Sequence, residues 1–283
     1  MIVQRFGFFL GAVCLVGILG GCCRPLPSPG ERMAMAQSLG RGGDLEPVLH
    51  VTPTFNLLGW QQLGPHSRGK PLHVYIEGDG LAWISFTRVS TNPTPLNPMG
   101  LRLALEDPAE SRLYLARPCQ YLMDDRCSKK AWTSHRFSPD VMAAYDKILD
   151  KIKAEFCPSS FVLFGYSGGG TVAALLAAQR NDVSLLVTVA GNLDVDAWVK
   201  KHGLTPLNGS LNPADFMDSL SRVPQYHFLG GRDSNITPDL FFDFEKGFKP
   251  RKNLHIRIVP QCDHGCGWVS RWRRLLNTIG EIH

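Results

Sequence analysis

The feature that most constrains the fold of this chain is the stretch FVLFGYSGGG at residues 161–170, together with the apolar run that follows it. Residues 161–164 are typical of a short buried strand, and TVAALLAAQ at residues 171–179 lacks Gly and Pro and predicts a buried helix. The pattern G-x-S-x-G, centred on Ser167, lies between them. A strand, a sharp turn and a helix are the context of a nucleophile elbow, where glycines permit the strained turn that exposes the serine hydroxyl. The alternative is a glycine-rich turn in which Ser167 only caps the helix.

Two later segments supply candidate partners for this serine. The predicted strand at residues 225–229 runs into GGRDSN, which contains Asp233, and the predicted strand at residues 254–259 is followed by CDHGCGW, which contains His264. Side chains that follow the strands of an open α/β sheet gather at one edge, so the three should lie close together. A histidine can accept the serine proton near neutral pH, and an aspartate can orient the imidazole and stabilise its cation. We therefore predict that Ser167, Asp233 and His264 form a catalytic triad.

Four other residues are alternatives for the base and the acid. His135 is an alternative base, although it lies far from the C-terminal region in sequence, and His202 is another, in the polar stretch KKHG. Asp194 and Asp196 follow the predicted strand at residues 185–190 and are alternative acids. Asp233 is favoured over these acids because it lies in a glycine-rich loop after a late strand, where the third triad member is expected, and His202 reads as exposed.

A glycine-rich turn is expected to contribute to an oxyanion hole. The predicted strand at residues 72–76 runs into Glu77-Gly78-Asp79-Gly80, where glycines would let backbone N–H groups approach a ligand oxygen. We predict that the backbone N–H of Asp79 (or of Gly80) and that of Gly168 hold the oxyanion. The carboxylates of Glu77 and Asp79 would oppose a developing negative charge, so neither side chain is assigned a role.

The first residues are expected to be a targeting segment. Arg5 precedes an apolar run at residues 6–19 that is too short to span a bilayer, and the run ends in LGGC at Cys22. This pattern resembles a bacterial lipobox, which implies that residues 1–21 are a signal peptide and that Cys22 carries acyl chains such as palmitate. The resemblance also implies sorting to the outer membrane, facing the periplasm, because the next residue is not Asp. An ordinary secretory signal, or lipidation of Cys23, is the alternative.

The rest of the chain divides into a tether and one domain. Residues 22–47 contain Pro25, Pro27, Pro29 and several glycines with little periodicity, so we expect a flexible tether there. The length and the 44% hydrophobic content suit a single α/β domain over residues 48–283. Residues 194–223 have mixed character and are a possible cap over the site.

Export would place the remaining cysteines in an oxidising compartment. We favour the two local disulfides, Cys119–Cys127 and Cys262–Cys266, with Cys157 free or paired to Cys23. A metal site at Cys262, His264 and Cys266 is the alternative, but it would need a fourth ligand or an open catalytic position.

Charge and motifs exclude several classes of partner. The net charge is +5, but the basic residues are scattered, and the densest group, Arg271, Arg273 and Arg274, lies on a predicted helix. A solvated helix face explains this group better than a nucleic-acid site does. The sequence has no phosphate loop and no metal-binding helix motif, so we expect no cofactor and no metal.

Taken in order, GYSGG, GGRDSN and CDHGC resemble the α/β-hydrolase superfamily over about residues 48–283. With YIEGDG and the lipobox, the chain looks like bacterial α/β-hydrolase lipoproteins of unassigned substrate, although Glu77 stands where His is common. The resemblance implies an α/β fold with a mostly parallel central sheet and helices on both faces. It also implies a serine hydrolase that forms an acyl-enzyme on a small-molecule ester. A thioesterase, a peptidase and a non-catalytic envelope binding protein are the alternatives.

Overall fold

A single mixed sheet forms the centre of the molecule. The computed structural model describes residues 25–249 and 251–280. The sheet strands within these residues are β1 (Glu46–His50), β2 (Leu57–Gln62), β3 (Leu72–Ile76), β6 (Arg112–Leu115), β7 (Phe161–Tyr166), β8 (Val183–Val189), β9 (Gln225–Gly230) and β10 (Leu254–Val259). They lie in the order β1-β2-β6-β3-β7-β8-β9-β10. β2 pairs antiparallel with β1 and β6, and every other pair is parallel. A separate antiparallel hairpin joins β4 (Trp83–Ser85) to β5 (Arg88–Val89).

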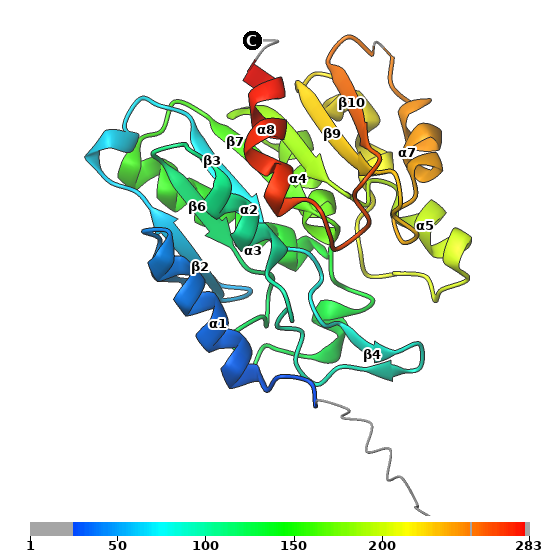
Figure 1. Ribbon diagram of the computed structural model, residues 1–283, viewed down its shortest axis with the longest axis horizontal. Helices are drawn as coiled ribbons and strands as arrows, with labels where there is room; N and C mark the ends of the chain where they lie inside the picture. The colour runs from blue at the N-terminus through cyan, green and yellow to red at the C-terminus, as the bar shows by residue number, and fades with distance from the viewer. Residues whose placement is uncertain (1–24, 250, 281–283) are drawn as a thin grey trace, which may run out of the picture.

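Helices cover both faces of the sheet, and Figure 1 shows α1, α2 and α8 on the near face. The helices are α1 (Pro29–Gly42), α2 (Met99–Glu106), α3 (Pro139–Phe156), α4 (Gly168–Gln179), α5 (Val195–His202), α6 (Met217–Leu220), α7 (Pro238–Glu245) and α8 (Val269–Gly280), with short 3-10 helices η1 (Pro65–Ser67), η2 (Lys129–Trp132) and η3 (Pro213–Phe216). The predicted α/β architecture, with a mostly parallel sheet between two helical layers, is confirmed.

The two layers follow from the alternation of side chains along the strands. In β3, Val74 and Ile76 pack into the cluster that includes α3 and α4, whereas Tyr75 points to the opposite face. There Tyr75 stacks on Phe164 of β7 with ring centroids 4.3 Å apart, and Trp272 of α8 packs edge-on against both rings. The central strands β3 and β7 thus bury both of their faces, as expected of a parallel sheet between helices.

The flexible tether predicted for residues 22–47 is wrong over most of its length. Ser28 caps α1 by accepting the N–H of Glu31, and the Glu31 carboxylate accepts the N–H of Ser28. The helix packs on α2, and its buried face includes Ala36 and Gly40. A Cβ on Gly40 would lie 2.3 Å from the ring of Trp60, so this close approach requires glycine. The ordered fold therefore begins before the predicted boundary at residue 48.

The possible cap at residues 194–223 is part of the main domain. η3 and α6 pack on α4, and Leu193, Val195, Leu220 and Val223 belong to the core cluster on that face. α5 borders the predicted site, as described below.

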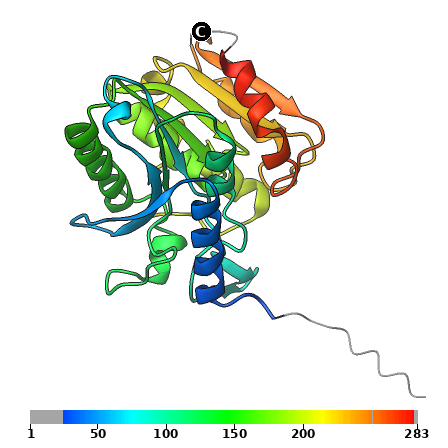
Figure 2. The same cartoon turned by 60° about the vertical axis from the view of Figure 1, so that its left-hand side comes forward.

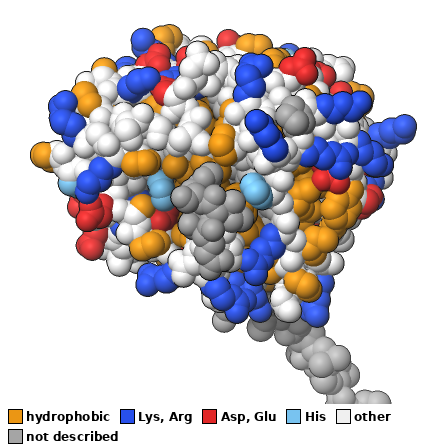
Figure 3. All heavy atoms as spheres, turned by 90° about the horizontal axis from the view of Figure 1, so that it is seen from above, with side chains coloured by type: hydrophobic (Ala, Val, Ile, Leu, Met, Phe, Trp, Pro, Cys, Tyr) orange, Lys and Arg blue, Asp and Glu red, His pale blue; other side chains and the backbone are white. Residues whose placement is uncertain are grey.

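Seen from the end of the molecule that carries the C-terminus, Lys and Arg side chains are spread over the face with Asp and Glu among them (Figure 3). This face presents no continuous basic patch. Within residues 25–249 and 251–280, no helix combines the length and apolar character needed to cross a bilayer.

A buried histidine should make the protein sensitive to mild acid. His227 in β9 is fully buried between Thr188 and Gln225, and burial lowers its pKa to about 3. A histidine whose folded pKa is depressed contributes stability above its ordinary pKa, near 6.5, and this is lost as the pH falls, because only the unfolded chain takes up the proton. We expect this group to lower the free energy of unfolding by about 1.4 kcal/mol per pH unit below pH 6.

Urea denaturation between about pH 6.5 and pH 5 should show a shallower dependence in His227→Gln than in the wild type. His66→Gln, at an exposed histidine of η1, should leave the dependence unchanged. An equal slope in wild type and His227→Gln would contradict the prediction.

Candidate active site

Ser167 occupies a strained turn between β7 and α4. Its backbone has φ 52° and ψ −121°, a conformation that residues other than glycine rarely adopt. Ser167 N–H donates to the carbonyl of Val189 (3.0 Å), and the carbonyl of Ser167 accepts the N–H of Asn192 (3.2 Å). The turn also requires glycine, because a Cβ on Gly165 would lie 2.3 Å from the carbonyl oxygen of Gly169. The hydrogen bonds to the neighbouring segments hold Ser167 in this strained conformation. A strained serine between a strand and a helix is the geometry of a nucleophile elbow.

The structure brings the three predicted triad residues together. Ser167 Oγ lies 3.0 Å from His264 Nε2, and His264 Nδ1 lies 2.8 Å from Asp233 Oδ2. The side chain of Asp233 is fully buried, whereas that of His264 is 26% exposed. The other carboxylate oxygen of Asp233 accepts the N–H groups of Asn235 (2.8 Å) and Ile236 (2.9 Å). These bonds orient the carboxylate toward the imidazole.

The four alternative residues are engaged elsewhere. His135 Nδ1 pairs with the hydroxyl of Ser134, and His202 Nε2 lies 2.7 Å from the carbonyl of Asn235. Asp194 caps α5 by accepting the N–H of Ala197, and Asp196 lies in the first turn of the same helix. None of the four has a contact with Ser167 or His264 among the hydrogen bonds of the described chain.

The predicted Cys262–Cys266 disulfide is wrong. Cys262 is a buried free thiol in the core beside α8, and Cys266 is an exposed free thiol. The loop is held instead by the side chain of Asp263, which accepts the N–H groups of Gly265 (2.8 Å) and Cys266 (2.6 Å). This turn orders the loop that carries His264. Because both ring nitrogens of His264 face Asp233 and Ser167, the geometry also does not support a metal site with the two cysteines.

The other local disulfide is confirmed. Cys119 and Cys127 are bonded, with their Cα atoms 5.7 Å apart. Cys157 is a free thiol after the end of α3. Its alternative partner Cys23, and the predicted lipidation site Cys22, lie outside the described residues.

Sequence reasoning missed two residues that touch His264. The hydroxyl of Tyr166 donates to the carbonyl of His264 (2.8 Å) and so fixes the backbone of the loop. The side-chain amide of Asn235 lies 3.2 Å from His264 Nε2, and the indole N–H of Trp198 in α5 donates to the same amide. Position x of G-x-S-x-G and a second polar residue after the acid were the signals available in the sequence, but neither indicates a contact alone.

Glu77, the first residue after β3, is a buried link between the glycine turn and α2. Its carboxylate accepts the N–H groups of Gly78 (2.9 Å) and Gly100 (3.0 Å) and the hydroxyl of Tyr114 (3.0 Å). Burial raises the pKa of this carboxyl, and these donors oppose the shift. Its charge therefore faces the start of α2, where a carboxylate is favourable, rather than the reacting serine.

Replacing Glu77 by Gln should destabilise the protein, because all of its partners are donors and an amide NH₂ would face one of them. We expect a loss of about 1–3 kcal/mol in the free energy of unfolding, measured by urea denaturation. Glu110→Gln is the matched control, since Glu110 is 70% exposed and pairs only with exposed Lys70. The control should change stability by less than about 0.5 kcal/mol. A Glu77→Gln variant as stable as the control would contradict this assignment.

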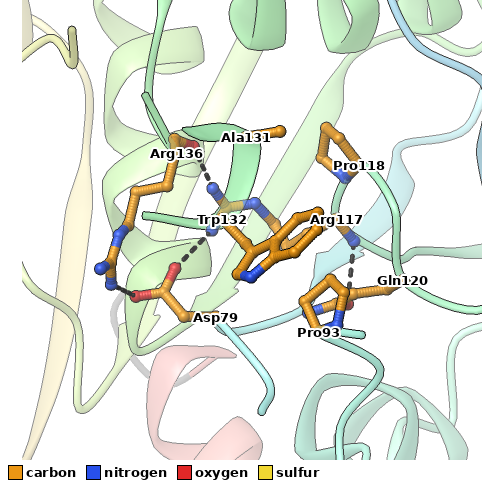
Figure 4. A pocket seen from close by; sticks show the side chains of 8 residues that line it. All are labelled: Asp79, Pro93, Arg117, Pro118, Gln120, Ala131, Trp132 and Arg136. Atoms are coloured by element: carbon orange, nitrogen blue, oxygen red, sulfur yellow. Dashed lines mark hydrogen bonds and ion pairs between the residues drawn. The ribbon is translucent and has the colours of Figure 1, made fainter. Parts of the chain in front are cut away.

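The second carboxylate of the turn, Asp79, lies beside the predicted oxyanion hole and is held by two arginines. A Cβ on Gly168 would meet Asp79 Oδ1 at 2.3 Å, so this carboxylate packs directly against the residue after Ser167. Arg117 contacts Asp79 Oδ1 (3.0 Å) and Arg136 contacts Oδ2 (2.6 Å), as Figure 4 shows. Burial alone would raise the pKa of Asp79, but attraction to Arg136 and Arg117 outweighs it and lowers the pKa.

This ion cluster is packed rather than open. The arginine side chains are only 5% and 7% exposed, and Arg117 also donates to the carbonyl of Arg136. The cavity beside them, lined by Trp132 and Gln120 among others, has a volume of about 10 Å³, enough for about one water molecule. The cluster therefore cannot hold an acyl group, and its role is to fix Asp79 and compensate its charge.

The backbone donors of the predicted oxyanion hole fit this arrangement. Gly168 is the first residue of α4, where an amide has no partner within the helix. The N–H of Gly78 is already bonded to Glu77, which leaves Asp79 and Gly80 as donors from the turn. The predicted pair, Gly168 and Asp79, is thus consistent with the hydrogen bonds around it.

Comparison with known proteins gives likeness in structure without likeness in sequence. No family model and no curated protein sequence matches this chain. An esterase of Pyrococcus furiosus superposes with a TM-score of 0.61 at 13% identity, covering 87% of this chain and 93% of the esterase. Est1E from Butyrivibrio proteoclasticus superposes at 0.56 and 14% identity, covering 83% and 99%. A 2,6-dihydroxy-pseudo-oxynicotine hydrolase superposes at 0.60 and 14% identity, covering 90% and 73%. With its sheet order, elbow and helical layers, this chain has the α/β-hydrolase fold.

Proposed function

We propose that the protein is a serine hydrolase that cleaves carboxylic esters through an acyl-enzyme. The observation that carries this proposal is the chain of contacts from Ser167 Oγ to His264 Nε2 (3.0 Å) and from His264 Nδ1 to Asp233 (2.8 Å). A serine hydroxyl becomes a competent nucleophile when a base within hydrogen-bond distance accepts its proton and a third group orients that base. The esterases among the structural neighbours favour an ester over a thioester or peptide.

The reaction would proceed in two steps. Ser167 Oγ attacks the ester carbonyl carbon while His264 Nε2 accepts its proton, and Asp233 stabilises the resulting imidazolium. The backbone N–H groups of Gly168 and Asp79 would hold the oxyanion of the tetrahedral intermediate. His264 then returns the proton to the leaving alcohol, and a water activated by the same imidazole hydrolyses the acyl-Ser167 ester.

The location is a further part of the proposal. The lipobox-like sequence ending at Cys22 supports export and attachment to a bacterial envelope membrane through acyl chains, with the catalytic domain facing the periplasm. Intact-mass analysis of protein purified from membranes would test this directly. An unmodified chain, or a chain cleaved at another residue, would refute attachment at Cys22.

A fluorophosphonate probe tests the catalytic proposal. The wild-type protein should become labelled at Ser167, and His264→Ala should label far more slowly, because the serine then lacks its base. Ser184→Ala, at an exposed serine of β8, is the matched control and should label like the wild type. A folded wild-type protein that stays unlabelled would favour the non-catalytic binding protein instead.

A further inference from the structure

Exposed apolar side chains gather at one end of the molecule. Phe86, at the turn of the β4–β5 hairpin, is 96% exposed, and Trp83 in β4 is 42% exposed. Leu26, near the start of the described chain, and Met123, in the loop closed by the Cys119–Cys127 disulfide, are also exposed. We call these four residues the hairpin surface. Single exposed apolar residues are ordinary, but a group that includes an almost fully exposed phenylalanine marks an interaction site.

Hydrogen bonds show that the segments bearing these side chains are neighbours. Ser90 N–H donates to the carbonyl of Ala82 (3.0 Å) and closes the base of the hairpin. Arg32 in α1 donates to the carbonyl of Thr94, just after the hairpin, and the N–H of Tyr121 in the disulfide loop donates to Thr94 Oγ1 (2.7 Å). Figures 1 and 2 both show the hairpin at the same end of the molecule as the N-terminal end of α1. The four apolar side chains therefore belong to one end of the fold.

The hairpin is also firmly held, so its tip is a fixed feature. Ala82 and Val89, at its base, pack with Trp132 of η2, and the indole N–H of Trp132 donates to the carbonyl of Ser90 (3.2 Å). A rigid hairpin can present Phe86 to a partner without a large ordering cost.

The charge near this surface is mainly positive. Arg88 in the hairpin and Lys129 and Lys130 in η2 are exposed. Asp125 in the disulfide loop is exposed as well, whereas Asp124 is paired with Arg126 at 2.6 Å. Among the described residues, Arg88, Lys129 and Lys130 have no ion pair, whereas Asp124 and Asp125 both lie within 4.0 Å of Arg126. This excess of unpaired cations complements an anionic surface.

We propose that the hairpin surface docks on the phospholipid bilayer, with Trp83 and Phe86 entering the interface and Arg88, Lys129 and Lys130 facing anionic headgroups. The choice of a membrane as the partner rests on the proposed function, in which Cys22 is lipidated. The described chain starts at Pro25 at this same end, three residues after Cys22, so the anchor would hold this end close to the bilayer. Aromatic side chains backed by cations are the usual residues of a protein–membrane interface.

Quenching by brominated lipids tests the docking in the full-length lipidated protein. Trp60, Trp132, Trp268 and Trp272 are buried, so Trp83 is the tryptophan best placed to report contact with lipid. In vesicles of phosphatidylethanolamine and phosphatidylglycerol with brominated acyl chains, the wild-type fluorescence should be quenched. Trp83→Phe should lose this quenching. Phe86→Ser, which keeps Trp83, should lose most of it, because the hairpin then lacks its main apolar contact.

The controls separate docking from anchoring and from folding. Phe242→Ser removes an exposed aromatic residue on α7 and should be quenched like the wild type. Phe86→Ser should keep wild-type turnover of p-nitrophenyl acetate in detergent, since it lies outside the catalytic residues. Lys129→Gln with Lys130→Gln should reduce quenching in anionic vesicles but not in phosphatidylcholine vesicles.

Two results would overturn the docking surface. The first is absence of quenching in protein whose intact mass shows acyl chains on Cys22. This result would refute the docking surface but not the lipid anchor. The second is a dimer in detergent, measured by sedimentation, that Phe86→Ser dissociates, which would assign the surface to a second copy of the chain. Conversely, unacylated protein that still shows Trp83 quenching with added vesicles would refute the anchor and keep the docking surface.

Discussion

Ser167→Ala should lower kcat/KM for p-nitrophenyl acetate by about 10⁴- to 10⁶-fold, and His264→Ala should have a similar effect. The hydroxyl of Ser167 and Nε2 of His264 are 3.0 Å apart, so removing either one removes the same proton transfer. For that reason the double variant should be about as active as either single variant, because residues that act as a unit do not add. Asp233→Asn should cost about 10⁴-fold, since it alters the imidazole tautomer without removing the base.

His66→Ala is the matched control, because His66 is exposed and its ring contacts only the carbonyl of Glu110 among its hydrogen bonds. It should keep wild-type kinetics. Circular dichroism and the urea midpoint should show that the Ser167 variant is folded. If His264→Ala retains turnover while Ser167→Ala does not, the base is another residue, and His135 and His202 are the ones to test next.

Arg136→Gln should lower kcat by about 10²-fold or more with a much smaller change in KM. Arg136 holds one oxygen of the Asp79 carboxylate at 2.6 Å, and that carboxylate packs against Gly168 beside the reacting serine. Without Arg136, the remaining negative charge would oppose the oxyanion, which forms only during the reaction. The loss should therefore appear in kcat rather than in substrate binding.

Two further variants separate this effect from simple destabilisation. Arg180 is also a largely buried arginine, and it pairs with Asp146, Asp150 and Asp182 away from the site. Arg180→Gln should lose stability, by up to about 3–5 kcal/mol, and keep kcat near the wild-type value.

Adding Asp79→Asn to Arg136→Gln should recover part of kcat, because it removes the uncompensated charge. A double variant no better than Arg136→Gln would show that the charge of Asp79 does not matter.

Much of this fold could be predicted because its signals are local. The apolar runs that mark β3, β7, β9 and β10 lie within a residue or two of the observed strands, and the turns after them carry Ser167, Asp233 and His264. Parallel strands bring such turns to one edge, so the meeting of these three residues could be predicted without knowing how any helix packs. Their catalytic role stays a prediction until it is tested.

The missed features depend on contacts between distant segments. Arg117 and Arg136 come from an irregular stretch whose sequence has no periodicity, and nothing in it indicates that both reach Asp79. Cys262 and Cys266 have the spacing of a local disulfide, but one side chain enters the core and the other faces solvent. α1 is missed because its buried residues, Arg32, Ala36 and Gly40, include no large apolar side chain.

The packing of α1 on the domain restricts how far the catalytic edge can travel. If the acyl chains are on Cys22, only the six residues from 23 to 28 separate them from the first turn of a helix fixed to α2. Six extended residues span at most about 22 Å. With so short a connection to the membrane, the active site could not cross the width of the periplasm. Its substrates would have to be molecules that reach the bilayer or are already part of it.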